Sequence, residues 1–110
     1  MGGGIVIINM TQQLKQLNGK PLVAGEDGEP ITVQSVCEQA LVSQIPGKNP
    51  DGGEKLRRYH LAMRIHAQEG LPDLQAEDVV LLKELVGEMF GPLVVGQVWE
   101  ILDPPAAGGA

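Results

Sequence analysis

The chain has 110 residues, with 14 acidic and 8 basic side chains that give a formal net charge of −6. This length suits one hydrophobic core, and apolar residues make up 43% of the chain, which excludes an intrinsically disordered protein. Direct binding to nucleic acid is not expected of such an acidic chain, because phosphate contacts need a basic surface.

The first residues, 1–13, predict either a flexible end or one extra strand. MGGG has nothing to bury, whereas IVII at positions 5–8 is a short apolar run. Met10 opens MTQQLKQLNGKPL and reads as a natural start, so that residues 1–9 would be translated upstream sequence. Alternatively, IVII is a real strand that joins the sheet of the hairpin that follows it.

Residues 17–33 predict that hairpin. The pieces KPLV and EPITV flank AGEDG, whose Asp27-Gly28 step favours a turn. Pro21 and Pro30 restrict the pairing to edge or terminal positions of a ladder. A hairpin this small is marginal by itself, so it must pack on helices or on another chain.

Helical periodicity begins at Thr32 and predicts a first helix over about residues 32–45. Thr32 is the expected N-cap, and Pro46-Gly47 ends the helix. One face of this helix gathers apolar residues at the spacing of a core-facing stripe. These residues are Val33, Val36, Cys37, Ala40 and Leu41.

A loop rich in proline and glycine leads to a second helix, predicted over about residues 53–69 with Gly70 as its C-terminal stop. Its inward stripe is expected to consist of Leu56, Tyr59, Met63 and Ala67. Leu61 and Ile65 fall outside this stripe, which suggests a helix covered on two sides.

The third and fourth helices are predicted over about residues 75–90 and 92–102. Acidic residues gather at the start of the third, where the helix dipole favours them. Gly91-Pro92 separates the two helices. The third helix presents a stripe of Val79, Leu82, Val86, Met89 and Phe90, with Leu81 and Leu85 beside it. The fourth contains Gly96, which costs about 1 kcal/mol relative to alanine and therefore suggests close approach of a neighbouring backbone.

These elements define a mainly α fold, in which an N-terminal β-hairpin precedes a compact bundle of about four helices. The globular domain is expected to span residues 14–102, and residues 103–110 are expected to form a flexible tail.

The last helix is apolar on all sides, which is normally the mark of a helix buried on all sides. Two interpretations stay open: it is the central core helix wrapped by the other three, or part of it lies in a subunit or partner interface. Both hold if the core continues across a dimer axis. The candidate interface residues are Leu93, Val94, Val98, Trp99 and Leu102.

Charge is unevenly distributed and supplies the candidate electrostatic contacts, which are Arg57, Arg58, Arg64, Glu77, Asp78, Glu84 and Glu88. Arg57, Leu61 and Arg64 share a helix face. This face could hold phosphate or an acidic partner, or it could pair with the acidic third helix of the same molecule or of a second copy. We favour the pairing, because the opposite charges lie within one small domain.

No pattern for catalysis, a cofactor or a metal is found. His60 and His66 are six residues apart, so they point in different directions on a helix and are expected on its surface. Cys37 lies on an apolar face and is expected to be a small core residue. The sequence therefore predicts no enzyme. A single cysteine and the lack of an apolar run of about 20 residues favour a cytoplasmic protein without a membrane segment.

The runs KLRRYHLAMRI, LQAEDVVLLKELVGEMFGPLVVGQVWEIL, LNGKPL and DGEPITV resemble small accessory proteins encoded by bacteriophages and prophages. The resemblance covers most of residues 14–102. It implies a viral origin and a role in virion assembly or in manipulating a host protein, in the host cytoplasm or in the virion. It assigns no functional residue.

The leading hypothesis is a non-enzymatic phage accessory protein that acts by protein–protein contact and forms a homo-oligomer. The hairpin and the last helix are its expected association elements. An alternative is an acidic inhibitor that blocks a nucleic-acid-binding site on a host protein. A DNA-binding regulator with a helix-turn-helix is disfavoured by the acidic balance.

Overall fold

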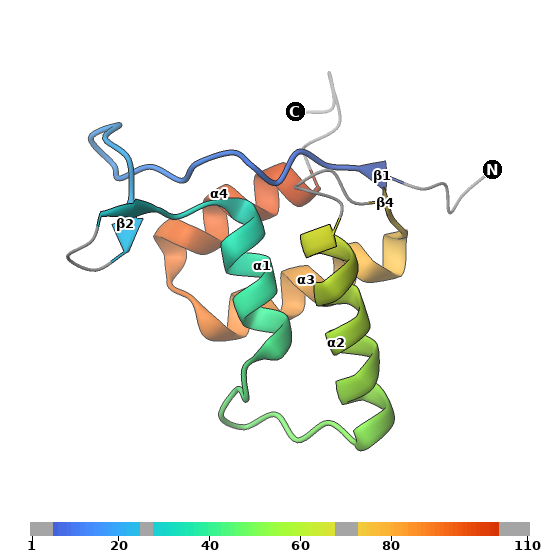
Figure 1. Ribbon diagram of the computed structural model, residues 1–110. Coiled ribbons are helices and arrows are strands. Elements are labelled where there is room, and N and C mark those ends of the chain that lie inside the picture. The colour runs from blue at the N-terminus through green and yellow to red at the C-terminus, as the bar shows by residue number, and fades with distance from the viewer. Residues whose placement is uncertain (1–5, 25–27, 68–72, 104–110) are drawn as a thin grey trace.

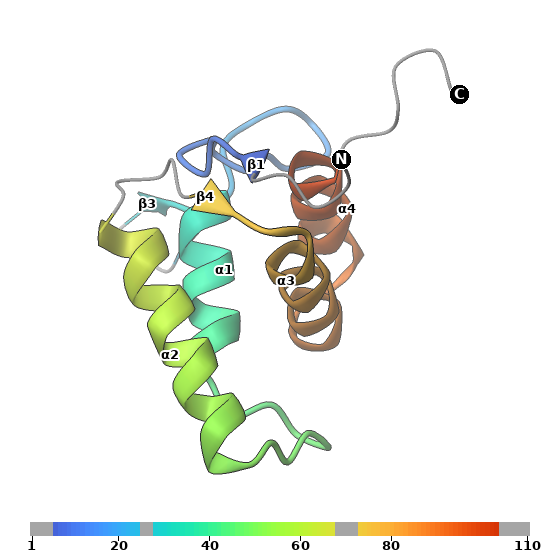
Figure 2. The same ribbon diagram turned by 90° about the vertical axis from the view of Figure 1, so that its right-hand side faces the viewer.

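A computed structural model describes residues 6–24, 28–67 and 73–103. Four helices form the body of the described chain: α1 (Val33–Val42), α2 (Gly52–Ala67), α3 (Ala76–Met89) and α4 (Pro92–Leu102). Two pairs of short strands accompany them (Figure 1). α1 packs against α2 and α3, and α3 packs against α4. Figure 2 accordingly shows the helices side by side in the order α2, α1, α3, α4. The predicted mainly helical fold with an N-terminal hairpin is confirmed.

The hairpin consists of β2 (Val23–Ala24) and β3 (Glu29–Pro30), which pair antiparallel with Val23 opposite Pro30. β1 (Val6–Ile7) is also a strand, but the prediction that it joins the hairpin is wrong. It pairs instead with β4 (Asp73–Leu74), which directly precedes α3. The alternative of a flexible end is therefore wrong for residues 6–13, because this segment is fixed at both sides by backbone pairing.

α1 begins with the expected cap. Thr32 Oγ1 accepts a hydrogen bond from Ser35 N at 3.1 Å, and Ser35 Oγ accepts one from Thr32 N at 3.1 Å. This reciprocal pair satisfies two backbone donors that a helix start leaves free. All five residues of the predicted stripe are buried. The helix ends at Val42, and Ser43 has extended backbone.

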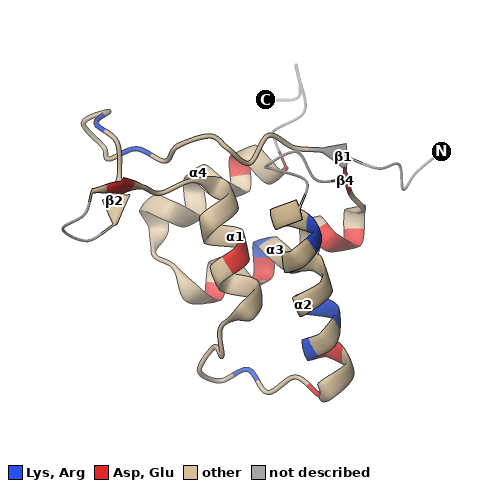
Figure 3. Cartoon of the chain, viewed as in Figure 1, with Lys and Arg blue, Asp and Glu red and all other residues tan. Residues whose placement is uncertain are grey.

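α2 turns a different face to the core from the one predicted. Leu61, Ala62 and Ile65 are buried, whereas Leu56, Tyr59 and Met63 are 54%, 52% and 52% exposed. Ala67 is exposed as well. Helical periodicity finds two apolar stripes on opposite sides of this helix and cannot tell which one α1 will cover. Figure 3 shows the basic residues that run along the same helix. The predicted stop at Gly70 lies outside the described residues.

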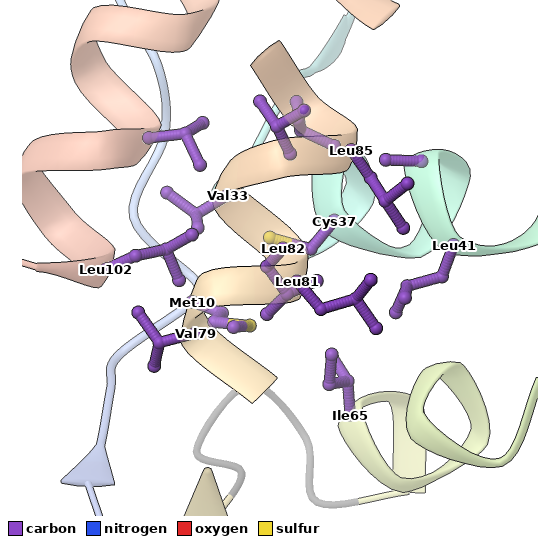
Figure 4. Close-up of a cluster of buried hydrophobic side chains, with 14 of the residues drawn as sticks. Met10, Val33, Cys37, Leu41, Ile65, Val79, Leu81, Leu82, Leu85 and Leu102 are labelled. Carbon is purple, nitrogen blue, oxygen red and sulfur yellow. The ribbon is translucent and has the colours of Figure 1, made fainter. Parts of the chain in front are cut away.

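α3 carries the largest share of the core. Val79, Leu81, Leu82, Leu85 and Val86 are buried, and Met89 and Phe90 pack against the core while partly exposed. Side chains from α1, α2, α4 and the N-terminal segment converge on α3 (Figure 4). The residues drawn there include Met10, Val33, Cys37, Leu41, Ile65 and Leu102. Met10 and Leu14 are fully buried, so the segment before the hairpin belongs to the core.

α4 has the predicted limits, and of the two environments left open for it the central core helix is wrong. It lies at the edge of the bundle against α3 and is not wrapped by the other three helices. Val98 and Leu102 are buried, whereas Leu93 and Trp99 are 36% and 39% exposed.

Gly96 lies on the open side of α4, which makes the expected close backbone approach wrong: a Cβ built there has no described atom within 4 Å. Gly87 on α3 is the glycine that a neighbour covers, because a Cβ there would lie 3.2 Å from Trp99 Cζ2.

Gly96→Ala is expected to raise the free energy of unfolding by about 1 kcal/mol, because alanine removes the entropic cost of glycine in an open helical position. Gly87→Ala is expected to raise the free energy of unfolding by less, since the new methyl group crowds the Trp99 ring. Urea unfolding of both variants measures the difference. Equal gains would show that Trp99 does not rest on Gly87.

Candidate interaction surface

The outer side of α2 bears a stripe of three large side chains, Leu56, Tyr59 and Met63, which we call the outer stripe. They follow one another at helical spacing and so lie on one face of the helix. This face is opposite the one that buries Leu61 and Ile65. Each of the three is more than half exposed. α2 therefore has one apolar face buried in the chain and a second one open to a partner.

Arginines border the outer stripe on the side of α3. Arg64 Nη2 donates to Asp78 Oδ2 at 2.8 Å, and Arg57 Nη2 lies 3.9 Å from Asp78 Oδ1. The Asp78 side chain is 12% exposed, and its Oδ2 also accepts from the Gln75 backbone N–H at the start of α3. Of the two pairings left open by the sequence, the structure shows the one with the third helix of the same molecule.

Two further basic residues, Arg58 and Lys48, form ion pairs within the chain. Arg58 is largely buried on the inner side of α2, where its Nε is 3.1 Å from Glu54 Oε2. Lys48, in the loop before α2, has its Nζ 2.8 Å from Glu84 Oε2 and 3.5 Å from Glu88 Oε1. The hydrogen bond with Glu84 raises the pKa of Lys48 and lowers that of Glu84.

A pocket of about 320 Å³ opens beside Tyr59, between the end of α1, the loop and the start of α2. Its wall combines apolar side chains such as Val42 and Ile45 with the cations Lys48, Lys55 and Arg58. Lys55 makes no ion pair with any described residue. The pocket extends the outer stripe with a surface that suits an acidic or polar group of a partner.

The candidate interface residues of α4 separate into two groups. Val98 and Leu102 are part of the core of this chain, and Val94 packs against that core. Leu93 and Trp99 remain partly exposed. Trp99 lies along α3, where its Nε1 donates to Lys83 O at 3.1 Å and Lys83 Nζ lies 4.8 Å from the ring centroid. The apolar last helix therefore packs against α3.

The solvent side of α3 and α4 forms a second surface, which we call the acidic face. Its apolar part consists of Val80, 64% exposed, and Trp99. Its acidic residues are Glu77, Glu84, Glu88 and Asp103. Lys83 Nζ lies 3.1 Å from Asp103 Oδ2, while Glu77 makes no ion pair with any described residue.

Gln97 is a structural residue that the sequence analysis did not identify. Its Oε1 accepts from Lys15 N at 2.8 Å, and its Nε2 donates to Lys15 O at 2.8 Å and to Leu93 O at 2.9 Å. The side chain thus holds the N-terminal segment against α4. The available signal was that Gln97 is one of two polar side chains, with Glu100, in this apolar helix.

The residues with reactive or metal-binding chemistry do not form a site. Burial, reinforced by the neighbouring Glu38, raises the pKa of Cys37 to about 12, so its thiol stays protonated and unreactive. His60 and His66 lie on the surface of α2 as predicted, with His66 Nδ1 3.2 Å from Glu38 Oε2. Among the described residues, no group of three histidine, cysteine or acidic side chains could hold a metal ion.

No helix in the described part of the chain has both the length and the apolarity to cross a membrane. Comparison of the chain with protein-family models, with curated proteins and with solved structures gives no match.

Proposed function

We propose that this protein acts by protein–protein contact, without catalysis, and that it associates with itself through the outer stripe of α2. The observation that supports this proposal is the exposure of Leu56, Tyr59 and Met63 on one helix face. Contiguous exposed apolar side chains of this size mark interaction surfaces. Tyrosine and methionine are also enriched in interfaces.

The proposal keeps the expected mode of action and moves its location from the last helix to α2. Two of the five candidate residues of α4 belong to the core of the chain itself. Trp99 packs on α3 and is 39% exposed. The predicted hairpin, residues 17–33 and the other expected association element, exposes two large apolar side chains, Leu17 and Val23, against three in the outer stripe.

The biological setting rests on the sequence resemblance alone. We infer from it a phage-encoded accessory protein that works in the host cytoplasm or in the virion. Virion assembly is the role that self-association serves most directly, because assemblies are built by repeating one contact.

A second candidate function is inhibition of a host protein that binds nucleic acid. The acidic face favours it, because Glu77, Glu84, Glu88 and Asp103 are exposed together with the apolar side chain of Val80. A complex of this kind would form with a basic host protein and weaken steeply as salt is added. Self-association without such a protein supports the first candidate.

Light scattering of the purified protein at micromolar concentrations tests the proposal. The wild type is expected to have at least the mass of a dimer, and Leu56→Asp is expected to have the mass of a monomer. Leu17→Asp is the matched control, because Leu17 is 96% exposed and lies outside α2. Circular dichroism must show that both variants fold. A monomeric wild type would contradict the proposed self-association.

A further inference from the structure

We propose that the contact is head-to-tail: the outer stripe of α2 in one copy binds the acidic face of α3 and α4 in a second copy. This inference rests on the self-association proposed above and names its partner surface. It follows from the charges around the two surfaces, from their positions in the molecule and from their apolar centres.

The charges are complementary. α2 carries four basic residues and one acidic residue, namely Lys55, Arg57, Arg58, Arg64 and Glu54. The acidic face carries Glu77, Glu84, Glu88 and Asp103. Two cations lie against these four carboxylates, because Lys48 pairs with Glu84 and Glu88 and Lys83 pairs with Asp103. Figure 3 shows these opposite charges on different helices. Complementary potentials across an interface guide encounter and select the partner.

A symmetric contact between two copies of α2 would bring like charges together. Arg57, Arg58 and Arg64 share only two carboxylates, those of Glu54 and Asp78. Lys55 makes no ion pair with any described residue. Both borders of the outer stripe are therefore net positive. Two such stripes repel each other at their borders, which is how proteins reject a wrong partner. Glu77 of a second copy, likewise without an ion pair among the described residues, suits these cations better.

The two surfaces lie on different helices. Figure 2 shows α2 and α4 at opposite edges of the molecule, with α1 and α3 between them. The α4 end of the acidic face is therefore far from the outer stripe, whereas its α3 end adjoins the border of the outer stripe, where Arg64 pairs with Asp78. One copy binds a second copy through its outer stripe and leaves its acidic face for a third. A contact between two different surfaces can repeat from copy to copy. The assembly then either closes into a ring or grows as an open filament.

The apolar centres of the two surfaces match as well. Val80 is 64% exposed in the middle of the acidic face. Trp99 packs against Gly87 of α3, the helix that also carries Val80, and its Nε1 donates to Lys83 O. An aromatic ring and a branched aliphatic side chain that are already ordered give the outer stripe a rigid surface to cover, which lowers the entropic cost of association.

Two variants, each defective in one surface, test the inference. Leu56→Asp puts a carboxylate in the outer stripe, and Val80→Lys puts a cation in the acidic face. Both positions are more than half exposed, so folding is expected to survive and is checked by circular dichroism. Each variant alone is expected to be a monomer by light scattering. An equimolar mixture is expected to regain a mass of at least two chains, because each variant retains the surface that the other lacks.

The possible failures can be told apart. A monomeric wild type overturns the proposed self-association, and this inference with it. A wild type that assembles, together with a Val80→Lys variant that assembles equally well, overturns only the head-to-tail contact and leaves α2 paired with itself. A mixture that stays monomeric beside an assembled wild type also overturns the head-to-tail contact.

Discussion

Leu14→Ala is expected to lower the free energy of unfolding by about 2–4 kcal/mol, the usual loss when a buried leucine is truncated. Leu14 does not belong to a helix, but its side chain is fully buried. Its backbone is paired on both sides, since Leu14 N donates to Ile31 O at 2.8 Å and Leu14 O accepts from Leu22 N at 2.9 Å. Little relaxation is possible at such a position, so a cavity remains.

Leu17→Ala is the control for that variant. Leu17 lies three residues further along the same segment and is 96% exposed, so its loss is expected to change the free energy of unfolding by less than about 0.5 kcal/mol. Urea unfolding followed by Trp99 fluorescence measures both variants. Equal effects of the two would mean that the segment does not dock on the helices as described.

Asp78→Ala is expected to cost about 1–3 kcal/mol, because it removes two interactions at once. The carboxylate accepts from the Gln75 backbone N–H at 3.1 Å, and loss of such a helix cap costs about 1 kcal/mol. It also pairs with Arg64 at 2.8 Å. The Arg64 side chain is 46% exposed, so water compensates part of the lost ion pair and the effect stays below that of a fully buried pair.

Two further variants separate those contributions in thermal or urea unfolding. Asp78→Asn keeps an oxygen that can accept from Gln75 N and removes the charge, so its cost is expected to lie between those of wild type and Asp78→Ala. Glu77→Ala, one residue earlier and exposed, is expected to change stability by less than about 0.5 kcal/mol. An Asp78→Ala variant as stable as Glu77→Ala would refute the role given to Asp78.

The sequence predicts the helices well where a local signal marks them. Thr32 fixes the start of α1 by its side-chain cap, and Gly91-Pro92 separates α3 from α4 at the expected place. These signals act over one helical turn and do not depend on the rest of the fold. The sequence is a weaker guide to the face that each helix buries, because that face depends on which other helix packs against it.

α2 illustrates that limit and also explains the candidate site. Its two apolar stripes are similar in size, and the arrangement of α1 against Leu61 and Ile65 decides which is covered. The stripe predicted to be core became the exposed one. The electrostatic pairing of Arg64 with the third helix was predictable, because opposite charges in a small domain have few other partners. The acidic face around Val80 was not, because it requires knowing how Trp99 lies across α3.

The contacts of the N-terminal segment could not be predicted either. β1 and β4 are two residues each, so neither shows the alternation that marks a strand. Their pairing joins positions far apart in the chain, with Val6 opposite Leu74. Gln97 likewise meets Lys15 across 82 residues. Short pairs at long range leave no local pattern in the sequence.

That long-range attachment has a consequence for the order in which the molecule folds. The segment around Lys15 is synthesised before the helices, yet its partner Gln97 is nearly the last described residue to be made. Closing so large a loop costs entropy that only an already collapsed set of helices can offset. The contact of this segment with α4 is therefore expected to form late, after the local pairing of Leu14 with Leu22 and Ile31. Until α4 is complete, the nascent chain exposes apolar core side chains, to which chaperones can bind.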